Sequence, residues 1–241
     1  MAMKPVAIVT GGSSNIGWAC VQRFCADHRV LIADLQPPQA PLPEGVSFIQ
    51  TDVTSQAQCA ALIQRAATQG ALAALVHSAA ITAEAKPFDQ IDAAEWHRLL
   101  EVNLTGSFLV AQSAIALLRR SRGAMVLVSS RAARTGYAAL TASGSGTKPH
   151  YCASKAGVLS LVKSLAVELA GDGVRVNAVV PGAIEGAMIP QQRWAELSAR
   201  IPLGRLGLAA EVADAAHYLC SSGARYVTGH ALDINGGTWM N

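Results

Sequence analysis

The stretch VAIVTGGSSNIG, residues 6–17, decides the fold of this chain. An apolar run over residues 6–10 leads into a turn rich in glycine and serine, and then into a helical pattern. Glycines let the backbone of such a turn approach a phosphate closely, and the amino end of a helix offers free N–H groups and a positive dipole. The spacing departs from G-x-G-x-x-G because Ser14 replaces the middle glycine. We predict a dinucleotide-binding turn, with an ordinary strand-to-helix turn as the alternative.

Short β-branched runs alternate with longer helical patterns along the rest of the chain. Strands are predicted at residues 6–10, 30–34, 46–50, 73–77, 124–129, 175–180 and 231–234, and helices at 16–26, 56–68, 93–118, 151–170 and 211–220. Near-continuous apolar strands separated by helices indicate a parallel sheet covered on both faces. We therefore predict an α/β fold: a Rossmann-type, doubly wound, seven-stranded parallel sheet with helices on both faces, forming a single domain over residues 1–241.

Composition excludes several classes of protein. The chain has 241 residues, 51% of them hydrophobic, and a net charge of only +3, which is too small and too scattered to indicate nucleic-acid binding. No apolar run reaches the roughly 18 residues of a membrane span, and the amino end lacks a secretory pattern. Five cysteines, an odd number without a C-x-x-C pair, suit reduced thiols. We expect a cytoplasmic protein with no membrane, nucleic-acid or metal site.

Two irregular stretches follow predicted strands, at residues 131–149 and 181–208. Ligands of doubly wound sheets bind beyond the carboxyl ends of the strands. Both stretches should overhang that edge, so we predict substrate loops at about residues 131–149 and 183–208.

Asp34 ends the second predicted strand, where a carboxylate can accept hydrogen bonds from the ribose hydroxyls of NAD. A 2′-phosphate at that point would be repelled, and neither the glycine turn nor Leu35 supplies an arginine or lysine to bind it. The sequence therefore predicts NAD rather than NADP, while an ordinary strand-end residue is the alternative for Asp34 taken alone.

Several short motifs follow one another in a recognisable order. They are TGGSSNIG at 10–17, Asp52-Val53, VNLTG at 102–106 with Asn103, Ser129-Ser130, Tyr151-x-x-x-Lys155, Pro181-Gly182 and DINGG at 233–237. Any one of them is weak, since Y-x-x-x-K occurs by chance in many helices. Together they resemble the short-chain dehydrogenases/reductases, in particular the 3-oxoacyl-reductase-like subgroup, over nearly the whole chain.

The resemblance implies a catalytic group of Asn103, Ser130, Tyr151 and Lys155. Tyr151 would donate or accept the proton at the substrate oxygen, Ser130 would orient that oxygen, and Asn103 would hold a water that links Lys155 to solvent. Tyr151 and Lys155 lie four positions apart, on one face of a helix. Lys155 would also hold the nicotinamide ribose, and its charge, together with the positive nicotinamide of the oxidised cofactor, is expected to lower the pKa of Tyr151. The alternative for Tyr151 alone is a packing role.

The resemblance also implies the cofactor contacts. These residues are Gly11, Ser13, Ser14, Asn15, Ile16, Gly17, Asp34, Asp52, Val53, Ala79, Tyr151, Lys155, Pro181, Gly182 and Ile184. Asp52 would contact the adenine amino group while the backbone at Val53 seats the ring. Capping of the helix at 56–68 is the alternative for Asp52, although Thr54 or Ser55 could cap it instead.

Three positions depart from the pattern of the family. Asn15 stands where alanine or glycine is usual, and asparagine tolerates left-handed backbone angles. His77 opens a segment that usually begins with asparagine, and we expect a structural histidine there. Gly186 replaces a threonine near the nicotinamide amide, so backbone groups around Ile184 would hold the cofactor there instead.

The segment before Tyr151 is longer than is usual in the family, with residues 141–147 as the expected insertion. We predict a substrate-shaping loop there, against an inert surface excursion. Arg131 and Arg134 could pair with an anionic substrate group, although exposed arginines are common. His150 and Cys152 should point away from the catalytic face and take no part in chemistry.

The helix at 151–170 carries one apolar stripe, Val158, Val162, Leu165 and Leu169, and another side with the small residues Ala153, Gly157, Ser160 and Ser164. In the resembled family, this helix and the one before it pair between subunits. We expect a homo-oligomer, a tetramer in preference to a dimer, with packing on the chain's own sheet as the alternative.

The sequence thus predicts an oxidoreductase that transfers hydride between NAD(H) and a secondary alcohol or ketone. An NADP-dependent carbonyl reductase of the 3-oxoacyl type and a non-catalytic dinucleotide-sensing protein remain as alternatives. The substrate and the direction of the reaction stay open.

Overall fold

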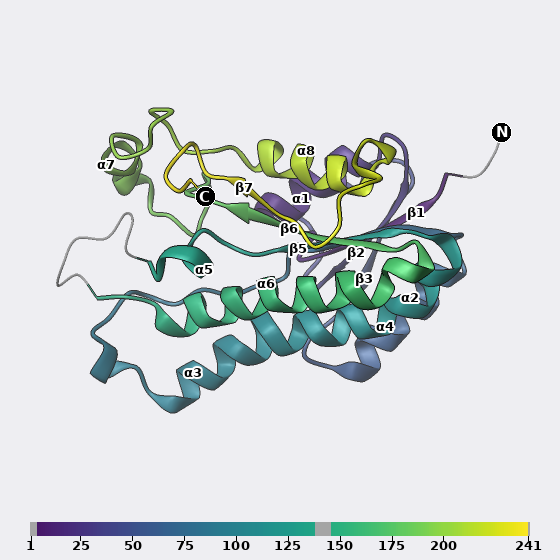
Figure 1. Cartoon of the computed structure of the whole chain (residues 1–241), viewed down its shortest axis with the longest axis horizontal. Coiled ribbons are helices and arrows are strands. Elements are labelled where there is room, and N and C mark those ends of the chain that lie inside the picture. Colours follow the sequence, from purple (N-terminus) through teal and green to yellow (C-terminus); the bar gives the residue numbers. More distant parts are fainter. Residues whose placement is uncertain (1–3, 138–145, 241) are drawn as a thin grey trace.

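A parallel sheet of seven strands forms the centre of the protein (Figure 1). The structure, a computed structural model, describes residues 4–137 and 146–240. The strands run in the order β3-β2-β1-β4-β5-β6-β7, and every neighbouring pair is parallel. They are β1 Val6–Thr10, β2 Arg29–Asp34, β3 Val46–Gln50, β4 Leu72–His77, β5 Ala124–Val128, β6 Arg175–Pro181 and β7 Ala231–Ile234. The predicted fold class and all seven predicted strands are confirmed, with ends shifted by a residue at most.

Helices cover both faces of the sheet, as the doubly wound prediction requires. Figure 1 shows α1 (Asn15–Phe24) and α8 (Ala209–Cys220) on one face, and α2 (Gln56–Ala67), α4 (Gly106–Ser121) and α6 (Pro149–Leu169) on the other. The strands are apolar on both sides because each face is covered, and every residue of β1 is buried. Ile8 belongs to the core beneath α2, α4 and α6, whereas Val9 belongs to the core beneath α1 and α8.

The predicted helix at 93–118 contains an irregularity that the sequence did not indicate. It consists of α3 (Ala93–Leu100), a π-helical segment η2 (Glu101–Thr105) and α4. A single π turn inside an α-helix accommodates one extra residue and frequently marks a functional position. Asn103 lies in this turn and is fully buried.

Among the described residues, the continuous helix Ala93–Ser121 is long and apolar enough to cross a membrane by length and composition alone, with a mean hydropathy of 1.3 in its best window. The expectation concerned an uninterrupted apolar run, and this helix is not one, because Asn103, Ser107 and Gln112 interrupt it. The helix packs on the sheet through Val110, Ala114 and Leu118, and core helices pass the same test.

Both predicted substrate loops contain short helices that the sequence patterns did not reveal. The first holds α5 (Ala132–Thr135), and the second holds η5 (Gln191–Arg193) and α7 (Trp194–Ser198). Most of the expected insertion at 141–147 falls outside the described residues.

Candidate active site

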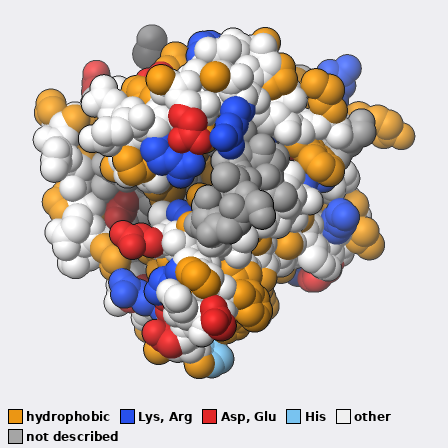
Figure 2. Space-filling model, turned by 90° about the vertical axis from the view of Figure 1, so that its left-hand side faces the viewer, with side chains coloured by type: hydrophobic (Ala, Val, Ile, Leu, Met, Phe, Trp, Pro, Cys, Tyr) orange, Lys and Arg blue, Asp and Glu red, His pale blue; other side chains and the backbone are white. Residues whose placement is uncertain are grey.

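A cavity of about 1040 Å³ lies beyond the carboxyl ends of the central strands. It extends from the ends of β1 and β2 to those of β5 and β6, across the point between β1 and β4 where the strand order reverses. Figure 2 looks onto this end of the molecule, where the surface is hollowed and charged side chains of both signs stand around the opening.

Most of the predicted site residues line this cavity. They are Gly11, Ser14, Asn15, Ile16, Asp34, Asp52, Val53, Ala79, Ser130, Tyr151, Lys155, Pro181, Gly182 and Ile184. Three predicted residues are not among the lining residues: Ser13, Gly17 and Asn103. Each of these three has a structural contact that explains its place.

The glycine turn packs too closely to carry side chains at two positions. Gly11 has a φ of +64°, and a Cβ there would lie 2.6 Å from the backbone nitrogen of Ala79. A Cβ on Gly17 would lie 1.9 Å from the carbonyl oxygen of Gly11, so this glycine lets α1 approach the turn. Ser14 occupies the N-cap position of α1 without a side-chain capping bond, and α1 therefore presents N–H groups to the cavity. This cradle fits a pyrophosphate.

Asp34 is fixed by the turn that it faces. Its Oδ2 accepts a hydrogen bond from the backbone nitrogen of Ser13 at 3.0 Å, and its Oδ1 accepts one from the nitrogen of Leu35 at 2.7 Å. The hydroxyl of Ser13 donates to the carbonyl of Gln36 at 2.6 Å. Ser13 therefore braces β2 against the glycine turn, while Asp34 itself stays at the cavity wall.

Asp52 shapes the turn at the adenosine end but does not cap α2. Its Oδ1 accepts from the backbone nitrogen of Thr54 at 2.9 Å and from the Thr54 hydroxyl at 2.8 Å. The N-cap of α2 is Ser55, whose side chain accepts from the nitrogen of Gln58. The capping alternative for Asp52 is wrong, although its carboxylate is partly occupied by a local turn.

Tyr151 and Ser130 meet at the centre of the cavity. Tyr151 lies in the first turn of α6, and Ser130 follows β5. Burial raises the pKa of the Tyr151 phenol above its usual value, and a hydrogen bond with Ser130 offsets part of this rise. The phenol is therefore protonated at neutral pH and able to donate to an oxygen atom.

Lys155 is buried beside the end of β5. Its Nζ donates to the carbonyl oxygen of Val128 at 2.8 Å, and burial lowers its pKa to about 8. Lys155 is not among the groups that shift the pKa of Tyr151. Burial dominates the Tyr151 pKa here, and the Lys155 ammonium lies against a carbonyl, so the expected lowering beside a bound oxidised cofactor stays a prediction.

Asn103 ties together segments around the cavity. Its Oδ1 accepts from the backbone nitrogen of Ile81 at 2.8 Å, and its Nδ2 donates to the carbonyl of Ile81 at 3.0 Å and to the Ser154 hydroxyl at 3.1 Å. Its own carbonyl accepts from Ser107 at 2.6 Å. The role of holding a water for Lys155 stays a prediction.

His77 behaves as a structural histidine. It is buried at the end of β4, and its Nδ1 forms a 2.7 Å hydrogen bond with the Thr10 hydroxyl. Burial, together with the nearby charge of Lys155, lowers its pKa to about 3. Its Nε2 has no hydrogen-bond partner among the described residues.

A clamp behind Tyr151 was missed by the sequence analysis. Glu95 of α3 pairs with Lys86 at 2.5 Å through Oε2 and with the buried His150 at 3.0 Å through Oε1. Lys86 also exchanges two backbone hydrogen bonds with Thr147, just before α6. His150 is thus directed toward Glu95, away from the reacting groups, and it anchors the first turn of α6. No local pattern reveals such contacts between distant segments.

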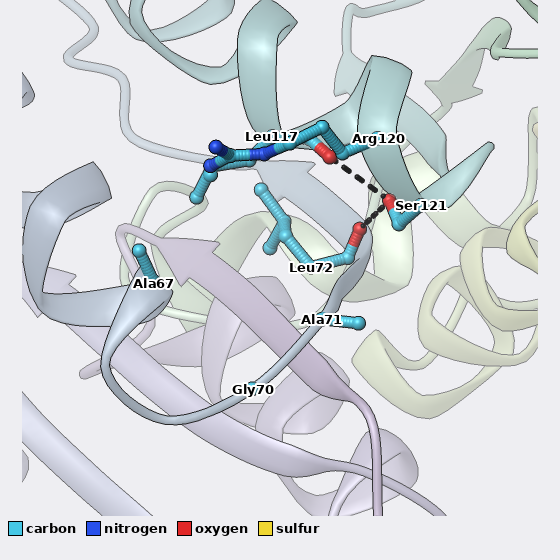
Figure 3. A pocket seen from close by; sticks show the side chains of 7 residues that line it. All are labelled: Ala67, Gly70, Ala71, Leu72, Leu117, Arg120 and Ser121. Carbon is cyan, nitrogen blue, oxygen red and sulfur yellow. Dashed lines mark hydrogen bonds between the residues drawn. The ribbon is translucent and has the colours of Figure 1, made fainter.

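Two features at the opposite end of the sheet lie far from this chemistry. Figure 3 shows a hollow of about 500 Å³ between the ends of α2 and α4, where the hydroxyl of Ser121 is bonded to the carbonyls of Leu72 and Leu117. Asp27, His28 and His217 form the one group in the described part of the chain that has metal-binding spacing, and both histidines are hydrogen-bonded to the Asp27 carboxylate.

Comparisons with known proteins agree with this geometry. Residues 11–238 match the family described as enoyl-(acyl carrier protein) reductase. The cis-4-hydroxycyclohexanecarboxylate dehydrogenase of Sinomonas cyclohexanicum is 36% identical, over 96% of this chain and 95% of that protein. A 3-oxoacyl-[acyl-carrier-protein] reductase of Thermotoga maritima is 33% identical, over 96% of each chain. The structure of the aldohexose dehydrogenase of Thermoplasma acidophilum, in ligand-free form, superposes with a TM-score of 0.85 at 29% identity, covering 98% of this chain and 94% of that one.

Proposed function

Because the chain belongs to the short-chain dehydrogenase/reductase family, we propose that it is an NAD-dependent dehydrogenase of a secondary alcohol, working reversibly on the corresponding ketone. Members of this family are oxidoreductases that use nicotinamide dinucleotides and act on CH–OH or carbonyl groups. The observation that carries the proposal is that Ser130, Tyr151 and Lys155 line the same cavity as the glycine turn and Asp34.

The residues of the cavity fit a dinucleotide from end to end. The close-packed turn at Gly11 and the open amino end of α1 suit the pyrophosphate, and Asp34 stands where the adenosine ribose would lie. Asp52 and Val53 would flank the adenine, and Pro181, Gly182 and Ile184 would flank the nicotinamide. When bound, the nicotinamide ring supplies the carbon that accepts or donates hydride.

The chain's own residues would handle the proton and the substrate oxygen. Tyr151, whose phenol is protonated at neutral pH and whose pKa burial raises further, gives its proton to a ketone oxygen, or takes it back from an alcohol in the other direction. Ser130 holds the same oxygen by a hydrogen bond. Lys155 would hold the nicotinamide ribose from its place against Val128.

Asp34 favours NAD as the cofactor. A carboxylate held by two backbone N–H groups cannot turn away from a 2′-phosphate without losing both bonds. Gly11, Ser14 and Asn15, the turn residues that line this end of the cavity, offer no cation to a phosphate. The NADP-dependent reductase of the 3-oxoacyl type therefore ranks second.

A dinucleotide-sensing protein without turnover is the alternative from another class. Such a protein would not need Ser130 and Tyr151 hydrogen-bonded to each other inside the cavity.

We further propose a cytoplasmic homo-oligomer, a tetramer in preference to a dimer. The apolar stripe of α6, made of Val158, Val162, Leu165 and Leu169, is buried in the core of its own chain, as the alternative has it. The support for an oligomer is Val167 on the other side, which is 83% exposed. Gly157, in contrast, packs within its own chain, because a Cβ there would lie 2.8 Å from Cδ2 of Leu104.

The proposal is tested by following absorbance at 340 nm with NAD, and separately with NADP, against a panel of secondary alcohols. We expect NADH formation with some alcohol, and a loss of roughly 10²- to 10⁴-fold in kcat for Tyr151→Phe with NAD binding retained. Turnover retained in Tyr151→Phe would contradict the mechanism. Binding of NAD without turnover of any alcohol or ketone would favour the sensing protein.

A further inference from the structure

Arg131 carries a buried guanidinium group directly after Ser130. The side chain is only 7% exposed, and its Nε and Nη1 atoms are enclosed without a hydrogen-bond partner in residues 4–137 and 146–240. Its Nη2 is not enclosed in the same way and forms no hydrogen bond with any described residue. Buried polar groups in native proteins are almost always paired, so an unpaired guanidinium calls for an explanation.

No negative charge of the described chain compensates Arg131. The groups that act on it electrostatically are Tyr137 and Cys152, and neither of these side chains is a carboxylate. Burial lowers its pKa from the usual value, yet an arginine stays charged at any physiological pH. The guanidinium of Arg131 is thus a buried charge that does not stabilise the folded state.

Arg134, in the short helix α5 that begins directly after Arg131, shows the contrast. Its guanidinium pairs with both carboxylate oxygens of Asp233, at 3.2 and 3.1 Å, and donates to the carbonyl of Ala231 at 3.2 Å. The two arginines that the sequence placed together are therefore different: Arg134 braces β7, whereas Arg131 has no such partner.

The position of Arg131 connects it with the substrate. It lines the cavity together with Ser130, Tyr137 and Tyr151, at the end remote from Asp34 and Asp52. Lys148 and Arg193 also line this end, and both can carry a positive charge. Arg193 is at the rim, 46% exposed and 3.6 Å from Glu196, so its charge is screened and shared.

From these contacts we propose that the cavity selects a substrate with a carboxylate group, which Arg131 binds while Ser130 and Tyr151 hold the oxygen that reacts. The substrate class is a hydroxy acid or keto acid whose carboxylate lies on the far side of a carbon spacer from the reacting carbon. This inference rests on the proposed function for the identity of the reaction, but the anion site itself does not depend on turnover.

The test compares an acid with its uncharged counterpart of the same shape. Cyclohexanecarboxylate and cyclohexanecarboxamide, which have no hydroxyl to oxidise, are titrated calorimetrically into the protein with and without saturating NAD. We expect the acid to bind roughly tenfold or more tightly than the amide, the range for a charge-assisted hydrogen bond. In Arg131→Met this difference should vanish while the affinity for the amide stays the same, and in Arg193→Met most of it should remain.

Thermal unfolding provides a second readout that a structural role would not give. Arg131→Met removes an unpaired buried charge, so its Tm should rise, whereas loss of a structural arginine would lower it. Arg131→Lys keeps the charge without the planar group, and should retain part of the preference for the acid.

Equal affinity for acid and amide in the parent protein, no binding of the acid, or a preference that persists in Arg131→Met would overturn the proposal. These outcomes are separable from failure of the proposed function. A preference for the acid that depends on Arg131, in a protein that does not turn over with NAD, would contradict only the proposed dehydrogenase activity. Turnover of neutral alcohols without acid preference would sink only the anion site.

Discussion

The side-chain amide of Asn15 fills the space beside Gly186. A Cβ on residue 186 would lie 2.2 Å from Nδ2 of Asn15 and 2.8 Å from its Cγ. Asn15 begins α1 with a φ of 39°, and Gly186 lies in the loop after β6 with a φ of +146°. The two departures from the family pattern, which seemed unrelated in the sequence, are therefore a complementary pair: the larger residue in the turn requires the smaller one in the loop.

The pair predicts a coupled response to mutation. Gly186→Ala should destabilise the protein by about 1–3 kcal/mol, because the new methyl group meets Asn15 and the backbone angle is strained for any side chain. Asn15→Gly, at a left-handed position that glycine adopts freely, should lower the free energy of unfolding far less. In the double variant, the free energy of unfolding in urea should recover by roughly 0.5–2 kcal/mol relative to the sum of the single changes. Strictly additive costs would mean that the contact is unimportant.

Asp34 should have two separable roles. Asp34→Asn keeps an oxygen that can accept from Ser13 or Leu35 but removes the charge, whereas Asp34→Ala removes both. We expect the ratio of kcat/KM for NAD to that for NADP to fall by about tenfold or more in both variants, since one repulsive charge is worth that much at short range. Only Asp34→Ala should also lower the Tm. An unchanged cofactor ratio in both variants would exclude Asp34 as the selector.

His77 should make stability depend on pH on the acid side. Its pKa is about 3 in the folded protein, while an imidazole in an unfolded chain titrates near 6.5. Between these values the unfolded chain binds a proton that the folded protein does not, so stability is full above pH 6.5 and is lost as the pH falls toward 3. The slope for one proton is about 1.4 kcal/mol per pH unit. In His77→Asn, the free energy of unfolding measured from pH 7 to pH 4 should fall less steeply by that amount; parallel curves would refute the assignment.

The clamp at Glu95 should position Tyr151 from a distance. Lys86 and His150 lower the pKa of the Glu95 carboxyl. The contribution of these contacts to the free energy of unfolding is therefore present above the usual carboxyl pKa, and it is lost as the pH falls through the lowered pKa. Glu95→Gln should lower the Tm and reduce kcat more than it raises KM, because the start of α6 loses its anchor. Asp214→Asn, which removes an exposed carboxylate paired with Arg23 and outside the cavity, is the matched control and should change neither. Equal effects in the two variants would leave the clamp without a catalytic role.

Sequence patterns were sufficient for the elements and for most of the cavity, for identifiable reasons. Apolar strands buried on both faces, such as β1, leave a continuous signal, and motifs at strand ends converge because parallel strands end at one edge. Contacts between distant segments leave no such signal. The clamp of Glu95 and His150 and the fit of Asn15 to Gly186 therefore could not be predicted.

Burial of charge was the other point that the sequence could not resolve. Arg131 and Arg134 are equivalent in the sequence, and exposure was the expectation for both. Only the fold shows that one guanidinium is paired with Asp233 and the other is enclosed without a partner. Similarly, the motif containing Asn103 was identified without any indication that it forms a π turn.

That π turn sets the rotational phase between two halves of one long helix. An α-helix advances by about 100° per residue, so the additional residue within Glu101–Thr105 turns α3 by roughly that angle relative to α4. Without this residue, α4 could still pack on the sheet, but α3 would then turn Glu95 away from His150. The π turn thus fixes the orientation of α3 relative to α4. Removing a single residue from the π turn would rotate α3, and with it the rim of the cavity, while leaving the core beneath α4 intact.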